Sequence, residues 1–174
     1  MDFKNLVLAT TVNGVPARRN SGEDRFKGFE VETRWRTRDH LFVRGGYAFH
    51  DSRFRSSVQL FDGVPTQLAG KRLEMSARHV AGAAVAWAPE KGLVASADVQ
   101  YVGARFLNKR NTALANGYAE ISAGLGWRVG HLELRVDGHN LTDRRPAVAE
   151  SELGDAQYYR LPARRVDATV RARW

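Results

Sequence analysis

The 174-residue sequence contains no cysteine, which excludes disulfide bridges, thiolate metal sites and thiol nucleophiles. No apolar run approaches the roughly 18–20 residues that a transmembrane helix requires, so a helical membrane protein is excluded. The first five residues show no basic segment followed by an apolar one, and therefore no secretory signal. Hydrophobic residues still make up 43% of the chain, enough for one domain with a large buried or lipid-covered surface.

Motifs of catalysis and metal binding are missing as well. The five histidines lack the H-E-x-x-H spacing of a zinc site, and there is no nucleophile elbow, P-loop or dinucleotide fingerprint. We therefore predict no enzyme activity, no metal and no cofactor. The formal charge of +8 raises the question of nucleic-acid binding, but the basic residues are spread along the whole chain. No nucleic-acid partner is predicted.

What the sequence does contain is alternation of apolar and polar residues in one segment after another. Leu132, Leu134 and Val136, for example, alternate with charged residues. Successive strand side chains point to opposite faces, so such a segment forms a strand with one apolar and one charged face. The pattern predicts eight strands, at residues 2–11, 24–36, 40–52, 77–88, 93–105, 117–128, 131–141 and 163–174.

The predicted connections alternate in length. Three are tight turns, at residues 37–39, 89–92 and 129–130. The others are long and rich in glycine, asparagine, serine and charge, at residues 12–23, 53–76, 106–116 and 142–162. Strands of about 9–11 residues with short turns at one end and long loops at the other are typical of outer-membrane barrels. The predicted fold class is all-β, an antiparallel transmembrane β-barrel segment of about eight up-and-down strands.

Aromatic residues favour a membrane over water on the apolar face. Those predicted to form two interfacial belts are Trp35, Trp87, Trp127 and Trp174 at the short-turn or C-terminal ends, and Tyr47, Phe49 and Tyr101 near the opposite ends. The alternative is a soluble β-sandwich or lipocalin-like barrel, whose tryptophans would lie in a core. A tightly packed soluble core favours large aliphatic residues, whereas these faces carry many alanines.

Charged residues form rows on the other face, which we predict to line the barrel lumen. These residues are Glu30, Glu32, Arg34, Arg44, Asp98, Glu120, Glu133, Arg135, Asp137, Arg165, Asp167 and Arg171. Rows 133–137 and 165–173 lie on neighbouring predicted strands, so ion pairs between these two strands are expected.

Two C-terminal motifs resemble a known family. Residues 136–143 resemble the v-x-N-L-T-D signature that ends the penultimate strand of TonB-dependent receptors. Residues 158–164 resemble the Tyr…Pro-Gly-Arg element that opens the last strand, with Ala163 in place of glycine. Residues 25–32 are similar to the family's x-G-x-E-x-E strand, and 68–79 to its G-x-x-L…P-x-H element. The signature residues are Asn140, Leu141, Thr142, Asp143, Pro162 and Arg164.

The resemblance implies an integral protein of the bacterial outer membrane, with periplasmic short turns and extracellular long loops. In this family a plug domain precedes a barrel of 22 strands, and residues 1–174 would supply the last eight. The plug and the segment that contacts TonB would then precede this chain, which would also account for the missing signal. The implied function is TonB-dependent uptake of a ferric siderophore or a similar scarce nutrient. Ligand-contact residues cannot be assigned.

The predicted loop side is basic, through Arg18, Arg19, Arg53, Arg55, Lys71, Arg72, Lys109, Arg110, Arg144 and Arg145. Two interpretations stay open: attraction of an anionic ligand, or contact with outer-membrane lipid and lipopolysaccharide phosphates. An alternative for the whole chain is a stand-alone eight-stranded barrel with a structural or interaction role.

Overall fold

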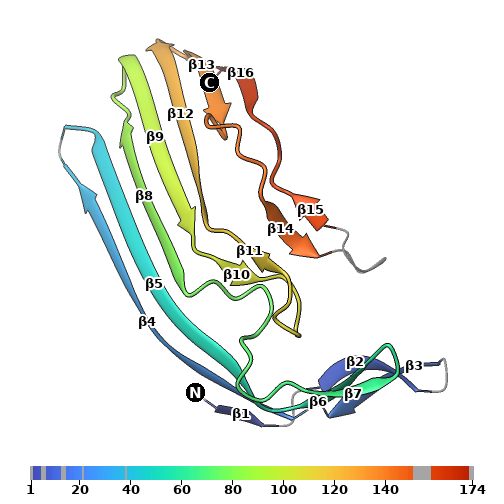
Figure 1. The fold of residues 1–174 in the computed structure, drawn as a ribbon. Coiled ribbons are helices and arrows are strands. Elements are labelled where there is room, and N and C mark those ends of the chain that lie inside the picture. The colour runs from blue at the N-terminus through green and yellow to red at the C-terminus, as the bar shows by residue number, and fades with distance from the viewer. Residues whose placement is uncertain are drawn as a thin grey trace.

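The computed structural model describes residues 2–4, 7–12, 15–20, 22–37, 39–150 and 158–172. Its main feature is one curved, antiparallel eight-stranded sheet (Figure 1). In sheet order the strands are β1 (Asp2–Lys4), β4 (Glu23–Arg36), β5 (Leu41–Ser56), β8 (His79–Trp87), β9 (Gly92–Val102), β12 (Tyr118–Val129), β13 (Leu132–His139) and β16 (Arg165–Ala172). The predicted all-β, up-and-down fold is confirmed.

The sheet is open rather than closed into a barrel. Each strand pairs with its neighbours in sheet order, and among the described strands β1 and β16 are paired along one edge only. The alternative of a closed eight-stranded barrel is therefore not the arrangement found. No helix among the described residues is long and apolar enough to cross a membrane.

Each long connection contains a small hairpin, and all four hairpins lie at the same end of the sheet (Figure 1). They are β2 (Val7–Val12) with β3 (Val15–Asn20), β6 (Val58–Phe61) with β7 (Val64–Gln67), β10 (Arg105–Phe106) with β11 (Leu114–Ala115), and β14 (Ala147–Glu150) with β15 (Tyr158–Arg160). The short turns lie at the other end, as predicted.

The first predicted strand, 2–11, is wrong. Only β1 joins the sheet, pairing with β4, whereas β2 turns back on β3. Alternation cannot distinguish these outcomes, because a hairpin strand alternates just as a sheet strand does. The strand predicted at 40–52 is also too short, since β5 continues to Ser56 and is paired with β4 to its end.

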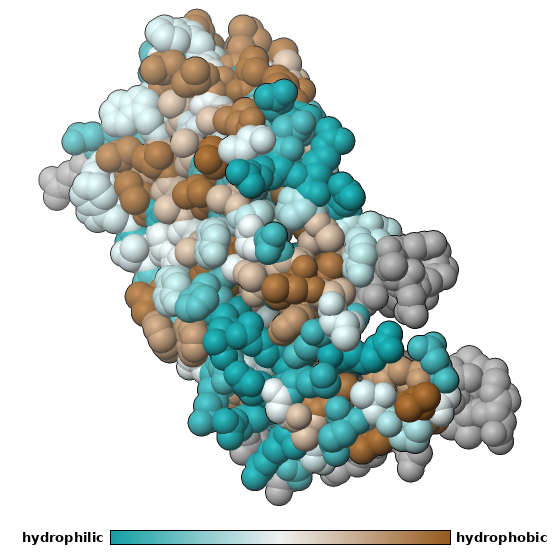
Figure 2. All heavy atoms as spheres, in the orientation of Figure 1, coloured by the Kyte–Doolittle hydropathy of each residue, from teal (hydrophilic) through white to brown (hydrophobic). Residues whose placement is uncertain are grey.

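The strand register joins the apolar residues into one continuous face. One row runs from Trp35 through Val43, Val85 and Ala97 to Ala123. Neighbouring rows repeat the pattern across to β16, and their side chains are exposed, as with Leu125 at 61% and Val170 at 72%. Among the described residues no second layer covers this face. Figure 2 shows hydrophobic side chains over much of the sheet surface.

A small core lies at the loop end of the sheet instead. The buried apolar side chains there are Phe54, Leu68, Ala77, Leu107 and Ala115. Backbone bonds from Phe54 N to Lys71 O (3.0 Å) and from Leu73 N to Ser52 O (3.1 Å) align residues 71–73 alongside β5. The loops therefore continue the hydrogen-bonded sheet beyond the ends of its long strands and pack against it.

Candidate functional site: the charged face and the loop end

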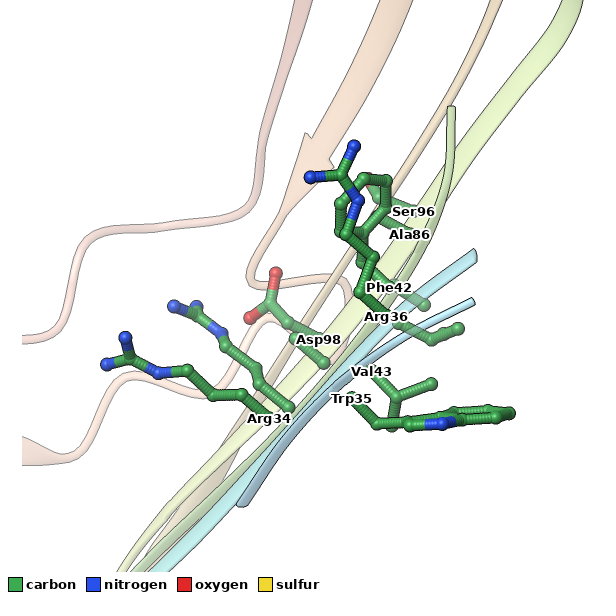
Figure 3. Close-up of a pocket in the computed structure, with 12 residues that line it drawn as sticks. Arg34, Trp35, Arg36, Phe42, Val43, Ala86, Ser96 and Asp98 are labelled. Atoms are coloured by element: carbon green, nitrogen blue, oxygen red, sulfur yellow. The ribbon is translucent and has the colours of Figure 1, made fainter. Parts of the chain in front are cut away.

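The face opposite the apolar one carries the charged rows, and the register aligns them across strands. Arg34 lies opposite Arg44, and the row continues through Ala84 to Asp98 and Ser122. In Figure 3, Arg34 and Asp98 lie on one side of the sheet, and Trp35 and Val43 lie on the other. The predicted separation of charged and apolar residues is therefore present, while the compartment that each face meets stays a prediction.

The middle of the charged face has small side chains. Gly46 and Gly82 are opposite each other, between Glu32 on one side and Gln100 on the other. Two hollows of about 580 and 460 Å³ lie against this part of the sheet. Residues that line them include Glu30, Glu32, Arg34, Arg44, Ala84, Asp98 and Gln100. Small residues flanked by charges leave room for a partner on this face.

Ion pairs on this face form mainly along strands or across β12–β13. Arg135 pairs with Asp137 at 2.7 Å and Arg165 with Asp167 at 2.8 Å, each between residues two apart on one strand. Arg34 and Glu32 do the same at 2.8 Å. Since residues i and i+2 share a face of a strand, such a pair needs no neighbouring strand.

The ion pairs expected between rows 133–137 and 165–173 stay a prediction, because Arg173 lies outside the described residues. His139 Nε2 lies 3.3 Å from Asp167 Oδ2 across β13 and β16. Further along, Asp137 lies opposite Asp167, where like charges face each other and each carboxylate takes an arginine from its own strand. Glu133, which lies opposite Arg171, pairs with Arg128 on β12 at 2.7 Å.

Other predicted charged residues have no ion pair in the described part of the chain. Arg44, Asp98 and Glu120 occupy neighbouring rows of the charged face without one. A charge withdrawn from water needs a partner or a hydrated surface. This face is therefore suited to contact water, a charged ligand or another part of the protein.

The signature residues lie close together at the loop end of the sheet, where their hydrogen bonds hold the connection between β13 and β16 in place. Asn140 is only 1% exposed, and its side-chain amide donates to the carbonyls of Arg144 (2.9 Å) and Pro162 (2.8 Å). Its Oδ1 accepts from the backbone N–H of Arg144 at 3.2 Å. Its φ of 47° is left-handed, a conformation that asparagine tolerates better than most residues.

Asp143 completes this fastening, which we call the Asn140 latch (Asn140, Leu141, Asp143, Pro162 and Arg164). Its Oδ1 accepts the backbone N–H of Arg164 at 2.9 Å, just before β16. That bond is the main cause that lowers the pKa of the Asp143 carboxyl below its usual value, helped by the charge of Arg145. Leu141 N donates to Ile121 O at 2.8 Å, which ties the latch to β12. The role of the latch is therefore structural: its hydrogen bonds hold the connection between β13 and β16 in place.

The predicted aromatic residues lie on the apolar face, except that Trp174 is outside the described residues. Tyr47 Oη lies 2.7 Å from His79 Nδ1, and Phe29 and Phe49 stack with ring centroids 5.9 Å apart. Of the predicted basic loop residues, the side chains of Arg18 and Arg19 also lie outside the described part.

Arg105 was not singled out by sequence analysis; it lies in β10 and is only 4% exposed. Its Nη2 donates to the carbonyls of Ala147 (3.3 Å) and Val148 (3.1 Å), and its guanidinium lies 5.6 Å from the Tyr118 ring centroid. Arg105 ends the strand predicted at 93–105, and alternation along one strand cannot reveal its contacts with a distant hairpin, so only the fold reveals its role. Within the described residues, no group of three or more histidine, aspartate or glutamate side chains could hold a metal ion.

A curved antiparallel sheet of long strands, apolar on one face and charged on the other, is the wall of a β-barrel. The family model for the TonB dependent receptor-like β-barrel matches residues 1–141. The chain belongs to the TonB-dependent receptor family. A search of curated proteins gives no match.

Solved structures with a similar fold include the siderophore receptor PiuA from Acinetobacter baumannii, with 18% identity and a TM-score of 0.79 over 98% of this chain and 25% of that one. The ferric-catecholate import receptor Fiu from E. coli K12, in its closed form, has 20% identity and a TM-score of 0.72, covering 98% and 24%. Pyoverdine-bound FpvA from P. aeruginosa has 12% identity and a TM-score of 0.72, covering 98% and 23%. The chain spans about a quarter of the length of these receptors.

Proposed function

We propose that this chain is the C-terminal part of the barrel of an outer-membrane receptor that imports a ferric siderophore or a similar scarce nutrient by TonB-dependent transport. The observation that carries the proposal is the division of one open sheet into a continuous apolar face and a continuous charged face. In this arrangement the apolar face meets lipid and the charged face lines the lumen.

The tryptophan positions support a membrane orientation. Trp35 on β4 is in the same register row as Val85 on β8, two strands away, and Val85 is two residues before Trp87. In the same way, Trp87 is in the row of Leu125 on β12, again two strands away, and Leu125 is two residues before Trp127. The tryptophans thus advance one residue per strand toward the short turns. One residue is about 3.3 Å along a strand and strands are about 4.8 Å apart, which corresponds to a tilt of about 35°.

At that tilt the three tryptophans lie at one level, and membrane barrels have strands tilted by about 35–45°. Phe49 and Tyr101 show the same shift of one residue per strand. Phe49 lies opposite His79 on β8, and the backbone N–H of Gly103 donates to His79 O, which places Gly103 in the row of Phe49. Tyr101 is two residues nearer the short turns than Gly103, over two strands. The two levels are about 7 residues apart, or about 19 Å along the membrane normal. This is slightly less than the roughly 25 Å apolar band of outer-membrane barrels.

The charged face is consistent with the proposal that the lumen holds a further domain. Arg44, Asp98 and Glu120 form no ion pair with the residues that the structure describes, and they lie near the small residues Gly46 and Gly82. In the complete receptor, a plug that precedes this chain and contacts TonB would fill the barrel and partner these charges. The loops at the other end would meet the ligand.

The experiment is iron uptake by the complete receptor that contains this segment. It would be expressed in bacteria without their own siderophore receptors, in matched TonB-proficient and TonB-deficient backgrounds. We expect saturable uptake of radioactive iron from at least one siderophore of a chemically diverse panel, and its loss without TonB. A receptor that inserts into the outer membrane but supports no TonB-dependent uptake of any chelate would contradict the proposal.

A further inference from the structure

Three arginines lie side by side where β4, β5 and the following loop meet. Arg25 is the cross-strand partner of Arg53, which is in turn the partner of Arg72. The backbone bonds on either side, Phe54 N to Lys71 O and Leu73 N to Ser52 O, make Arg53 and Arg72 a non-hydrogen-bonded pair. Side chains of such pairs are the closest in an antiparallel sheet, and like charges there repel each other.

The next row adds one cation and one carboxylate, and Arg78 reaches the same carboxylate from the residue just before β8. Lys27 lies opposite Asp51, and Asp51 Oδ1 is 3.1 Å from both Arg53 Nε and Arg78 Nη2. One carboxylate is therefore shared by two arginines. Within the described residues Arg25, Lys27 and Arg72 form no ion pair, so this cluster, named here the arginine row (Arg25, Lys27, Asp51, Arg53, Arg72 and Arg78), has an excess of positive charge.

The cluster is held in place by the backbone around it. Asn111, from the next loop, accepts from Arg72 N (2.8 Å) and donates to Arg72 O (2.9 Å). Arg53 Nη1 donates to Gly70 O at 3.0 Å. Burial and the charges of Arg78 and Arg53 lower the pKa of Arg72, as expected where cations are kept close together. The cations of this cluster are therefore already held close together before any anion binds.

The location of the row indicates which anion it would meet. Lys27 and Asp51, and then Arg25 and Arg53, follow Phe29 and Phe49 at two-residue steps, on the apolar face rather than the charged one. These rows are about 7 and 13 Å beyond Phe49 along the strand. Hydrophilic side chains gather over the lower ends of β4 and β5 and the adjoining loop (Figure 2).

We propose that the arginine row binds the phosphate group of a phosphorylated glycolipid in the outer leaflet, packed against the barrel beside Phe29 and Phe49. The proposal rests on the membrane orientation of the proposed function. Guanidinium groups match a phosphate through paired N–H···O bonds, and a doubly charged anion relieves the repulsion among them. The acyl chains of the same lipid would lie on the apolar face directly below.

The test uses the complete receptor in detergent, titrated with diphosphoryl lipid A and followed by native mass spectrometry. The variant Arg25→Gln/Arg72→Gln removes two cations that form no ion pair in the structure. The control Arg144→Gln/Arg160→Gln removes two exposed loop arginines at the same end of the sheet. Heat-modifiable gel mobility checks that each variant is folded.

We expect the Arg25/Arg72 variant to bind lipid A at least about tenfold more weakly, and the control to bind it like the wild type. Equal binding by all three proteins, or an equal loss in both variants, would overturn the proposal. Competition by inorganic phosphate at concentrations similar to those of lipid A would assign the site to a soluble anion and also overturn it. TonB-dependent uptake by the wild-type receptor is a separate readout, so failure of the lipid site is separable from failure of the receptor function.

Discussion

At the residue scale, most of the specific chemistry of this chain lies where strands become loops. Asn140 and Arg105 are both nearly fully buried there, and both use their side chains to satisfy backbone carbonyls. Loop backbone has no ladder to satisfy it, so a buried loop requires such side-chain donors. Asn140 was recognisable from the sequence because it belongs to a motif. Arg105 was not, because its partners come from a hairpin more than 40 residues away.

The Asn140→Ala substitution is expected to destabilise the protein by about 2–4 kcal/mol, since it leaves buried carbonyls without donors and puts alanine at a left-handed φ. The measurement is urea-induced unfolding of the complete receptor, refolded in detergent micelles. Asn116→Ala is the matched control, because Asn116 is exposed and makes no side-chain hydrogen bond in the structure. A loss no larger than that of the control would show that the latch does not hold the loop.

At the element scale, the spanning strands could be predicted because each has one apolar and one polar face, and alternation records this directly. The loop hairpins were missed because their strands are only two to six residues long. One of them did carry a sequence signal. Asp62-Gly63 is a two-residue turn with positive φ at both positions, 51° and 79°, which is what Asp-Gly favours.

The register between neighbouring strands was the second feature that the sequence could not predict. The charged rows of single strands were predicted correctly as belonging to one face, but their partners were not. The arginine row requires Arg25, Arg53 and Arg72 to align across two pairings, and the second follows an irregular loop. Alternation sets the face on which a residue lies; it does not set the position of one strand along its neighbour.

The close pairing of β4 and β5 gives a matched pair of glycine predictions. A Cβ on Gly28 would lie 2.2 Å from the carbonyl oxygen of Phe49, whereas one on Gly46 would meet nothing closer than 3.6 Å. Gly28→Ala should therefore destabilise the sheet by about 1–3 kcal/mol, and Gly46→Ala by much less. Urea midpoints of the two variants in the same detergent measure the difference. Equal midpoints would mean that β4 can shift relative to β5 at no cost.

The one-residue advance of the tryptophans per strand predicts a common membrane depth. Variants of the complete receptor would keep Trp35, Trp87 or Trp127 as the single tryptophan, all others being replaced by phenylalanine. They would be refolded into vesicles whose lipids are brominated at defined positions along the acyl chain. The three should be quenched most strongly at the same shallow position, because their level is the membrane interface. Depths that differ by two residues per pair, about 7 Å along the strand, would indicate untilted strands and refute the tilt of about 35°.

At the scale of the whole molecule, an open sheet in a membrane is incomplete. The outer edges of β1 and β16 have no neighbouring strand in the described structure, and lipid cannot satisfy their backbone N–H and C=O groups. The apolar face requires lipid, whereas the charged face requires water or protein. Both demands are met together if further strands continue the sheet until it closes around a polar interior.

Residues 1–174 alone are therefore expected not to transport. Closing eight strands on themselves would leave a bore that side chains alone fill, in which Arg44, Asp98 and Glu120 would each need a partner. The purified chain, refolded into liposomes, should give no saturable siderophore uptake and no heat-modifiable monomer band. A compact heat-modifiable band would instead favour a stand-alone eight-stranded barrel, and specific, saturable import would show that these strands suffice without a plug.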